Sequence, residues 1–166
     1  MRRTPEVTSG RDPLTAEQRR RNMAAIRGRD TKPELIVRRG LHAAGLRYRL
    51  HGKLPGKPDL VFPGRRAVIF VHGCFWHGHD CPMFKMPATR QDFWREKIER
   101  NQARDARAET VLLEDGWRVM TVWECALRGR ARLEPRSAIE ATRDWILGQD
   151  AIGVLGGEWI YQAARE

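Results

Sequence analysis

The ten residues from His72 to Cys81, which read His-Gly-Cys-Phe-Trp-His-Gly-His-Asp-Cys, hold five side chains that can bind a transition metal. The chain has three cysteines, and the third, Cys125, lies far downstream. A structural zinc ion takes four closed ligands from cysteine and histidine. One histidine with all three cysteines supplies that set: Cys74, His79, Cys81 and Cys125. We therefore expect zinc to tie this loop to the rest of the fold; the alternative is three buried free thiols beside surface histidines.

This zinc set leaves His72 and His77 unused, together with two aromatic residues between them, Phe75 and Trp76. A catalytic zinc is disfavoured, because four protein ligands leave no open position for a substrate. The unused side chains therefore favour a second function for this segment: catalysis, ligand binding or both.

Arginine dominates the charge of the chain, whose formal net charge is +10 over 166 residues. The planar guanidinium suits phosphate, so nucleic acid is the first partner to consider; the alternative is an arginine-rich surface that only keeps the protein soluble. The N-terminus lacks an apolar segment and no hydrophobic run reaches membrane length, so we expect no secretory signal and no membrane partner. An odd number of cysteines fits reduced thiols in a cytoplasm better than a disulfide framework.

Capping and turn residues divide the chain into helices and strands. Thr15 and Thr31 each stand three residues before Gln or Glu, which is the spacing of a capping box at the start of a helix. Thr89 is expected to cap a long helix, which Gly116 stops. The expected elements, in order, are helices 15–27 and 31–45, strands 46–50, 59–62 and 67–71, helix 89–115, strand 117–123 and helix 137–147.

This order of elements predicts one mixed α/β domain. Residues 1–14 are expected to form a flexible basic arm, residues 15–150 the domain, and residues 151–166 a C-terminal tail in which 154–162 can add an edge strand. The strand over 67–71 is a continuous apolar run, which is typical of a buried central strand.

The hairpin formed by strands 59–62 and 67–71 makes a specific prediction for Asp59. Pairing the strands about the Gly64–Arg65 bond places Asp59 opposite Phe70 and next to Val71. A carboxylate then lies beside the end of the neighbouring strand, and hard oxygen ligands of this kind suit magnesium. The alternative is a solvated carboxylate at the start of a strand.

His72 and His77 follow directly after that strand end. A histidine with a pKa near neutrality can take a proton from a water molecule that attacks phosphorus, and a second histidine can donate a hydrogen bond to the phosphate. Asp59 with these two histidines therefore indicates phosphodiester cleavage.

Several segments together resemble the very short patch repair (Vsr) endonuclease family, which nicks DNA beside a T:G mismatch left by deamination of 5-methylcytosine. They are Asn22–Ile26, Pro55–Asp59, Val68–His77, Lys85–Arg90, Phe93–Ile98 and Val122–Arg130. The resemblance runs from Thr15 to Arg130. It implies a restriction-endonuclease-like fold of the PD-(D/E)xK group, with a three-layer α/β core, a mixed sheet and a structural zinc site.

The resemblance also implies a magnesium site at Asp59 and the backbone carbonyl of Val71. Two features depart from the wider pattern. The PD-(D/E)xK group usually has a second acid and a lysine on the strand after the aspartate, whereas this strand reads Ile-Phe-Val-His. A threonine in a known family member is replaced by Val71, which keeps the backbone carbonyl but has no hydroxyl.

The remaining catalytic residues that the resemblance implies surround this metal site. His77 would be the general base and His72 would contact the scissile phosphate. Glu34 would be a supporting acid, and Asp105 in the long helix a further acidic neighbour. For Glu34 a purely structural role in the capping box remains the alternative.

The resemblance implies a DNA-binding set of Met23, Phe75, Trp76, Trp94, Lys97 and Asn101. Phe75, Trp76 and Trp94 would wedge into the base stack, and Met23 would enter from the opposite groove. Lys97 and Asn101 would face the mismatched pair. The alternatives are packing roles for Met23 and Trp94, and ordinary solvent-exposed helix positions for Lys97 and Asn101.

The leading interpretation is a magnesium-dependent, zinc-stabilised endonuclease that nicks T:G-mismatched double-stranded DNA. Two alternatives are a DNA-binding module of the same fold without cleavage and a broader restriction-type nuclease. Retention of Asp59, His72 and His77 favours cleavage over binding alone. We expect a cytoplasmic monomer, bound to the nucleoid when on DNA, and mismatch-repair proteins are further candidate partners.

Overall fold

The computed structural model describes residues 15, 17–18, 21 and 29–157. The basic arm, Met23 and most of the helix expected over 15–27 lie outside these residues. The capping box at the start of that helix is confirmed, because the backbone N–H of Gln18 donates to Thr15 Oγ1 at 3.1 Å and the backbone N–H of Thr15 donates to Gln18 Oε1 at 2.8 Å.

A five-stranded mixed sheet forms the centre of the described chain, with its strands side by side in sequence order. The strands are β1 (Arg49–Leu50), β2 (Leu60–Phe62), β3 (Ala67–His72), β4 (Arg118–Trp123) and β5 (Ile152–Leu155). The first three pair antiparallel, whereas β3, β4 and β5 pair parallel. The prediction of a mixed α/β fold is therefore confirmed.

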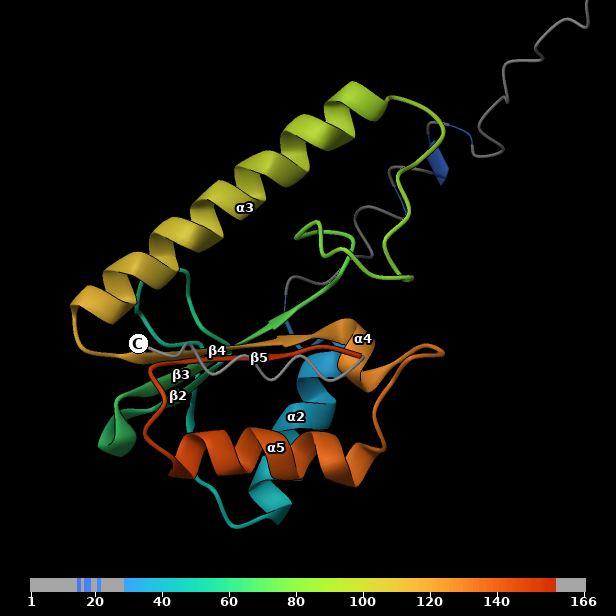
Figure 1. The fold of residues 1–166 in the computed structure, drawn as a ribbon. Coiled ribbons are helices and arrows are strands. Elements are labelled where there is room, and N and C mark those ends of the chain that lie inside the picture. Colours follow the sequence, from blue (N-terminus) through green and yellow to red (C-terminus); the bar gives the residue numbers. More distant parts are fainter. Residues whose placement is uncertain (1–14, 16, 19–20, 22–28, 158–166) are drawn as a thin grey trace, which may run out of the picture.

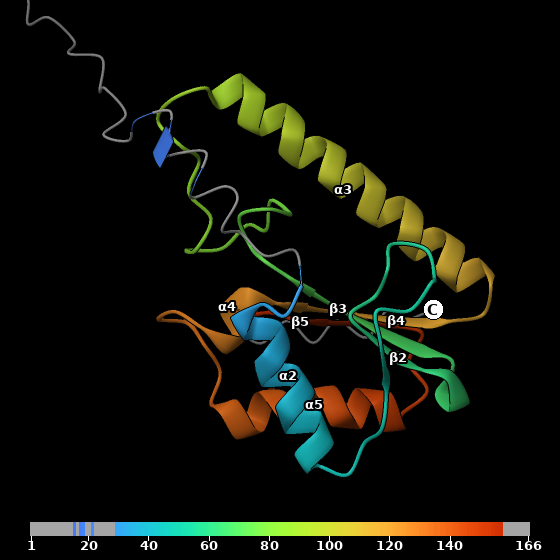
Figure 2. The same cartoon turned by 180° about the vertical axis from the view of Figure 1, so that it is seen from behind.

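Helices cover both faces of this sheet. The long helix α3 (Gln91–Glu114) crosses one face, and α2 (Lys32–Ala43) and α5 (Pro135–Leu147) lie on the other (Figures 1 and 2). Strand side chains alternate between the two layers, so that Ile69 packs toward α2 and α5, and Val68 toward α3. The chain thus forms three layers, helix on sheet on helix.

The hairpin register agrees with the prediction. Leu60 pairs with Ile69 and Phe62 with Ala67, which places Asp59 opposite Phe70. The turn is a short 3-10 helix, Pro63–Arg65, closed by Arg66 in the left-handed region at φ 45°. As expected, β3 is buried over Ala67–Phe70.

Other boundaries differ from the prediction. Thr89 does not cap α3, which begins at Gln91 after Arg90 in the left-handed region at φ 54°. The Arg90 guanidinium lies 4.4 Å from the centre of the Phe93 ring in a cation–π contact, and no side chain caps the start of α3. Helix α5 begins two residues early, at Pro135, because the Glu134 carboxylate caps it by accepting from the backbone N–H of Ser137.

The C-terminal part of the domain also differs. The short helix α4 (Glu124–Leu127) follows β4 directly and was not predicted. Strand β5 pairs with β4, whereas the edge strand was expected only from Val154 onward. Gly116, at φ 76°, ends α3 as expected. In the described part of the chain, no helix is both long enough and apolar enough to cross a membrane.

Candidate active site

The candidate site lies where β3 ends. The parallel strands β3 and β4 finish side by side, with His72 paired to Trp123. The segment after β3 carries His77 and His79, and α4 after β4 carries Cys125. Because parallel strands end at the same edge of a sheet, these residues meet there.

Two hydrogen bonds to β3 fix Asp59, one on each side of Phe70, the residue opposite to it. Its backbone N–H donates to the carbonyl of Ile69 at 3.0 Å. Its Oδ2 accepts from the backbone N–H of Val71 at 2.7 Å. The carboxylate therefore lies beside Val71, with one oxygen held by the backbone, and this geometry suits a divalent metal bound by hard oxygen ligands.

The surroundings of Asp59 disfavour its charge. Burial raises the pKa of Asp59 to about 6, and the nearby charge of Glu34 raises it as well. The hydrogen bond from Val71 lowers this pKa but does not offset burial. A bound cation would stabilise the ionised form, so the site is arranged to gain from metal binding.

This raised pKa predicts how stability depends on pH in metal-free protein. Burial raises the pKa of Asp59 in the folded protein to about 6, above the ordinary value of 3.8. Ionisation therefore leaves stability unchanged below about pH 4, and the destabilisation grows between pH 4 and pH 6 and is complete above pH 6. At 1.36 kcal/mol per pKa unit, Asp59→Asn should stabilise the metal-free protein at pH 8 by up to about 3 kcal/mol.

Urea unfolding of wild type and Asp59→Asn in EDTA, at pH 4 and pH 8, measures this effect. We expect the gain at pH 8 to shrink at pH 4. An equal effect at both pH values would contradict the raised pKa.

His72 and His77 form a stacked pair beside Asp59. Their ring centres are 3.8 Å apart and their planes differ by 4°. Burial, reinforced by the charge of His77, lowers the pKa of His72 to about 3, so His72 is neutral at physiological pH. A neutral imidazole at this position can still donate one hydrogen bond to a phosphate oxygen.

Asp105 on α3 holds the second histidine. Its carboxylate makes a short contact with Nδ1 of His77. Burial alone would raise the pKa of Asp105, but the hydrogen bond and charge of His77 lower it overall. A carboxylate on Nδ1 orients the ring and leaves Nε2 available to accept a proton. The structure thus joins two residues that are 28 positions apart in sequence.

These groups line one open cavity of about 470 Å³. Asp59, Val71, His72, His77 and Asp105 all contribute to its wall. Four further residues were not singled out by the sequence and bring positive charge or an imidazole to the same wall: Arg29, His51, Lys57 and Arg104. Lys57 belongs to the Pro55–Asp59 segment, whose chemistry we assigned to Asp59 alone. The cavity combines an acid cluster with a cationic rim, a combination that suits a phosphodiester.

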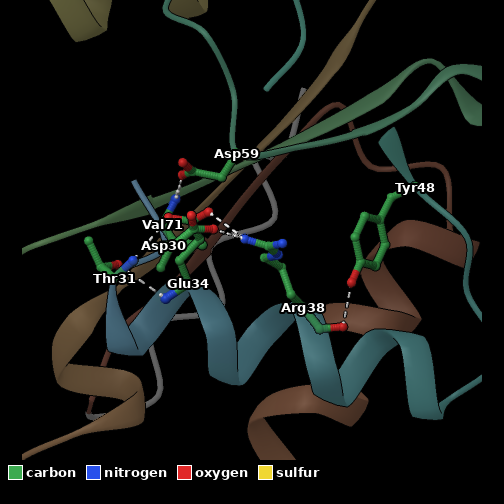
Figure 3. A network of polar contacts seen from close by, with 7 residues as sticks. All are labelled: Asp30, Thr31, Glu34, Arg38, Tyr48, Asp59 and Val71. Carbon is green, nitrogen blue, oxygen red and sulfur yellow. Dashed lines mark hydrogen bonds and ion pairs between the residues drawn. The ribbon is translucent and has the colours of Figure 1, made fainter. Parts of the chain in front are cut away.

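Glu34 has the structural role that its spacing predicted. The capping box at the start of α2 is complete, with Glu34 Oε2 accepting from the backbone N–H of Thr31 at 3.3 Å and Thr31 Oγ1 accepting from that of Glu34 at 3.4 Å. Glu34 is only 2% exposed and also pairs with Arg38 on the same helix (Figure 3). The negative charge of Glu34 also helps to raise the pKa of Asp59, so this capping residue influences the electrostatics of the site.

The four residues of the expected zinc set converge. One ligand atom from each of Cys74, His79, Cys81 and Cys125 lies within 4.8 Å of the others. Nδ1 of His79 is 3.5 Å from Sγ of Cys125. Two of the thiols, Cys74 and Cys125, are buried. Three sulfurs and one imidazole nitrogen gathered in this way are the donor set of a tetrahedral metal site such as that of zinc.

Burial also affects the protonation of the side chains in this cluster. It raises the pKa of both Cys74 and Cys125, and it lowers the pKa of His79 so that the imidazole is neutral, as a ligand must be. The His79 ring is stacked on Trp123, with 4.1 Å between ring centres. A metal would replace the protons on the thiols and stabilise their thiolates.

Aromatic side chains cluster beside the cavity. Phe75 contacts both Trp76 and Trp94, with ring centres 5.1 and 5.4 Å apart. Lys97 Nζ lies 5.2 Å from the centre of the Trp76 ring and 5.5 Å from that of Trp94. Trp94 belongs to neither core cluster of the described chain, and Phe93, which we did not single out, adds an exposed ring.

Two amides of α3 anchor the histidine loop. Asn101 Nδ2 donates to the carbonyl of Trp76 at 2.8 Å. Gln102 Nε2 donates to the carbonyls of His77 and Gly78 at 3.2 and 3.3 Å. Gln102 was missed by the sequence analysis, although it follows Asn101 directly. These bonds hold the loop against the helix and thereby fix both His77 and Trp76.

Comparison with known proteins identifies the arrangement. A family model for the DNA mismatch endonuclease Vsr matches residues 11–83. DNA mismatch endonuclease Vsr of Escherichia coli (strain K12) is 47% identical over 147 residues, which is 88% of this chain and 94% of the relative. The chain belongs to the Vsr family of DNA mismatch endonucleases.

Two nicking enzymes are further relatives. Type II nicking enzyme V.XorIIP of Xanthomonas oryzae pv. oryzae is 53% identical over 126 residues, 75% of this chain and 93% of the relative. V.NmeAIP of Neisseria meningitidis is 44% identical over 121 residues, 72% of this chain and 86% of the relative. An alignment as long as that with the E. coli Vsr must include Asp105 and Cys125, which lie beyond the region matched by the family model.

Proposed function

We propose that this Vsr-family protein nicks one strand of double-stranded DNA beside a T:G mismatch, with Mg²⁺ at the active site and Zn²⁺ in the cysteine–histidine cluster. Family membership makes it a strand-nicking mismatch endonuclease, an endodeoxyribonuclease. The mismatch type, both metals, a restriction-endonuclease-like fold and action as a cytoplasmic monomer are part of the proposal.

One observation supports the proposed chemistry: the Asp59 carboxylate and His77, whose ring is oriented by Asp105, line the same cavity. Asp59 and the backbone carbonyl of Val71 would hold Mg²⁺. When bound, Mg²⁺ would stabilise negative charge on the phosphate. Lys57, Arg29 and Arg104 on the cavity wall would bind the neighbouring DNA backbone.

The histidine pair then has two distinct roles. Asp105 orients His77 through Nδ1, so that Nε2 of His77 takes the proton from the attacking water. His72 is held neutral by burial and donates a hydrogen bond to the scissile phosphate. The two roles are assigned from the partners of the rings, because the contact between the Asp105 carboxylate and Nδ1 is made by His77 and not by His72 among the described contacts.

The aromatic cluster supports selection of a mismatch. Phe75, Trp76 and Trp94 lie together on the loop and helix that border the cavity. Inserting such rings costs a few kcal/mol of unstacking per base step. A mismatched pair is easier to unstack than a matched pair, so the cost is lower at T:G. Met23, which lies outside the described residues, would enter from the other groove.

Trp76→Ala should therefore reduce the preference for mismatched DNA more than it reduces general DNA binding. Stacking on an aromatic side chain contributes about 1–3 kcal/mol, so we expect about a tenfold or greater loss of nicking on T:G duplexes. Binding to matched duplexes, which depends on cationic side chains and salt, should change little.

Binding and nicking of matched and T:G duplexes at two salt concentrations test the wedge, with Trp76→Phe as the control that keeps a stacking ring. Equal losses on matched and mismatched DNA would mean that these aromatic residues only pack against one another.

A further inference from the structure

A second group of potential metal ligands lies next to the catalytic carboxylate. One ligand atom each of Asp30, Glu34 and His51 lies within 4.8 Å of the other two. His51 lines the same cavity as Asp59, and the charge of Glu34 is close enough to Asp59 to raise its pKa. Two carboxylates and an imidazole at this separation could hold a cation, and a third carboxylate is their neighbour.

The chain supplies a cation of its own to this group. The NH1 atom of Arg38 pairs with Oδ1 of Asp30 and lies 3.2 Å from Oε1 of Glu34. Figure 3 shows the Arg38 side chain reaching from α2 to both carboxylates, with Asp59 nearby. The Arg38 side chain is 18% exposed and that of Glu34 is 3% exposed, so solvent screens this pair only weakly.

The position of Arg38 is fixed by the helix and its anchor. Arg38 stands four residues after Glu34, on the same helical face, which is the favourable order for an acid and a base. The other oxygen of Glu34 is held by the capping box at Thr31. Tyr48 OH donates to the backbone carbonyl of Arg38 at 2.7 Å, and the Tyr48 ring packs on Phe62 of β2. The guanidinium is therefore held by its contacts with both acids, while Tyr48 anchors the backbone of Arg38.

Such a built-in cation has a consequence for metal binding. Without it, two acids beside Asp59 would present a strongly negative site able to attract a second divalent ion. With it, one positive charge is shared between Asp30 and Glu34 and offsets part of their negative charge. Of the three carboxylates, Asp59 is the one without an ion pair among the described residues, and it therefore remains for a metal. A buried acid left without its partner is costly, so the buried Glu34 is stabilised by its ion pair with Arg38.

We propose that Arg38 is a positioning residue whose guanidinium occupies the cation position between Asp30 and Glu34 and thereby restricts divalent metal binding at the active site to Asp59. The inference deepens the proposed function, because it rests on the magnesium site assigned to Asp59 there. It predicts that removing the guanidinium opens a second site for a hard divalent ion, formed by the ligands that Arg38 now holds.

Titration of zinc-loaded protein with Mn²⁺, followed by the electron paramagnetic resonance signal of free Mn²⁺, tests this inference without using nicking as the readout. Mn²⁺ prefers oxygen ligands and does not displace zinc from thiolates. The test variant is Arg38→Met, which keeps the aliphatic stem, and Arg38→Lys keeps the charge. Arg39→Met is the matched control, since Arg39 is an exposed neighbour on the same helix.

We expect Arg38→Met to bind one more Mn²⁺ per chain than the wild type, and Arg38→Lys and Arg39→Met to bind as many as the wild type. Adding Asp30→Asn to Arg38→Met should remove the extra ion. If Arg38→Met does not fold, as judged by circular dichroism, Arg38→Gln replaces it with the same expected result. A neutral Arg38 variant that binds no more Mn²⁺ than Arg39→Met overturns the inference.

The proposed magnesium site is tested separately in the same titration. Asp59→Ala in the wild-type background should lose the Mn²⁺ ion that wild type binds. If it does not, the metal assignment under the proposed function fails, while the gain caused by removing Arg38 is still measured on its own.

Discussion

Asp59→Ala should abolish nicking while DNA binding stays close to wild type. The substitution removes the carboxylate that is hydrogen-bonded to β3 and lines the cavity, and with it the proposed magnesium ligand. A metal ion contributes several kcal/mol of transition-state stabilisation, so the single-turnover rate should fall by about 1,000-fold or more. Binding should persist because phosphate contacts from cationic side chains supply most of the affinity.

Gel-based nicking and fluorescence-anisotropy binding on the same mismatched duplex measure both effects. Asp92→Ala is a suitable control, since Asp92 is an exposed acid at the start of α3 that pairs only with Arg95 among the described contacts. Near wild-type cleavage by Asp59→Ala in Mg²⁺ would show that the metal is bound elsewhere. Loss of binding as well would point to a structural role for Asp59.

Removing a ligand of the cysteine–histidine cluster should cause the largest loss of stability. Structural zinc in small domains contributes apparent binding energies of about 10–16 kcal/mol, and that energy is coupled to folding. Cys125 joins α4 to the loop after β3, and its Sγ also accepts from the backbone N–H of Gly157 at 3.3 Å. Loss of the metal would therefore release both the histidine loop and the segment after β5.

We expect purified wild type to contain one tightly bound zinc per chain, and Cys125→Ser and His79→Ala to lose most of it. The thermal unfolding midpoint of both variants should fall by far more than that of His42→Ala, an exposed histidine on α2. Elemental analysis and thermal unfolding are the measurements. A metal-free wild type that is fully folded would rule out a structural zinc.

The position of Asp59 could be predicted from sequence because it depends only on strand period and turn length. Side chains in a strand alternate between the two faces of the sheet, so the register of the hairpin is largely determined once the turn is placed. The observed register agrees with the predicted one. The four residues proposed to bind zinc could also be chosen from the sequence, because the cysteines are few and a histidine stands close to two of them. These are local patterns or simple exclusions, and they do not require knowledge of packing.

Contacts made by α3 could not be predicted in the same way. The pairing of His77 with Asp105, the stacking of His77 on His72, and the anchoring of the loop by Gln102 depend on how that helix lies across the sheet. Sequence periodicity identifies the helix but not the rotation that points Asp105 toward the loop. Only the family resemblance drew attention to Asp105.

The predicted N-terminus of the long helix α3 was wrong. Thr89 has the residue type of a cap, but Arg90 in the left-handed region precedes α3 and stacks on Phe93 instead. Cys125 lies just past the end of β4, as expected, but within a short helix, α4, that was not predicted from the sequence. Arg38 gave no signal in sequence beyond its spacing from Glu34, because its importance depends on Asp30 and Asp59 lying nearby.

The most direct test of the account is magnesium-dependent nicking of two labelled duplexes that differ only in T:G versus C:G at one position. We predict that purified protein nicks the T:G duplex on one strand next to the mismatch, that EDTA stops the reaction, and that the C:G duplex is cut far more slowly. Equal cleavage of both duplexes, or cleavage of neither in Mg²⁺, would contradict the proposal of a mismatch-selective nicking endonuclease with Asp59 as its metal ligand.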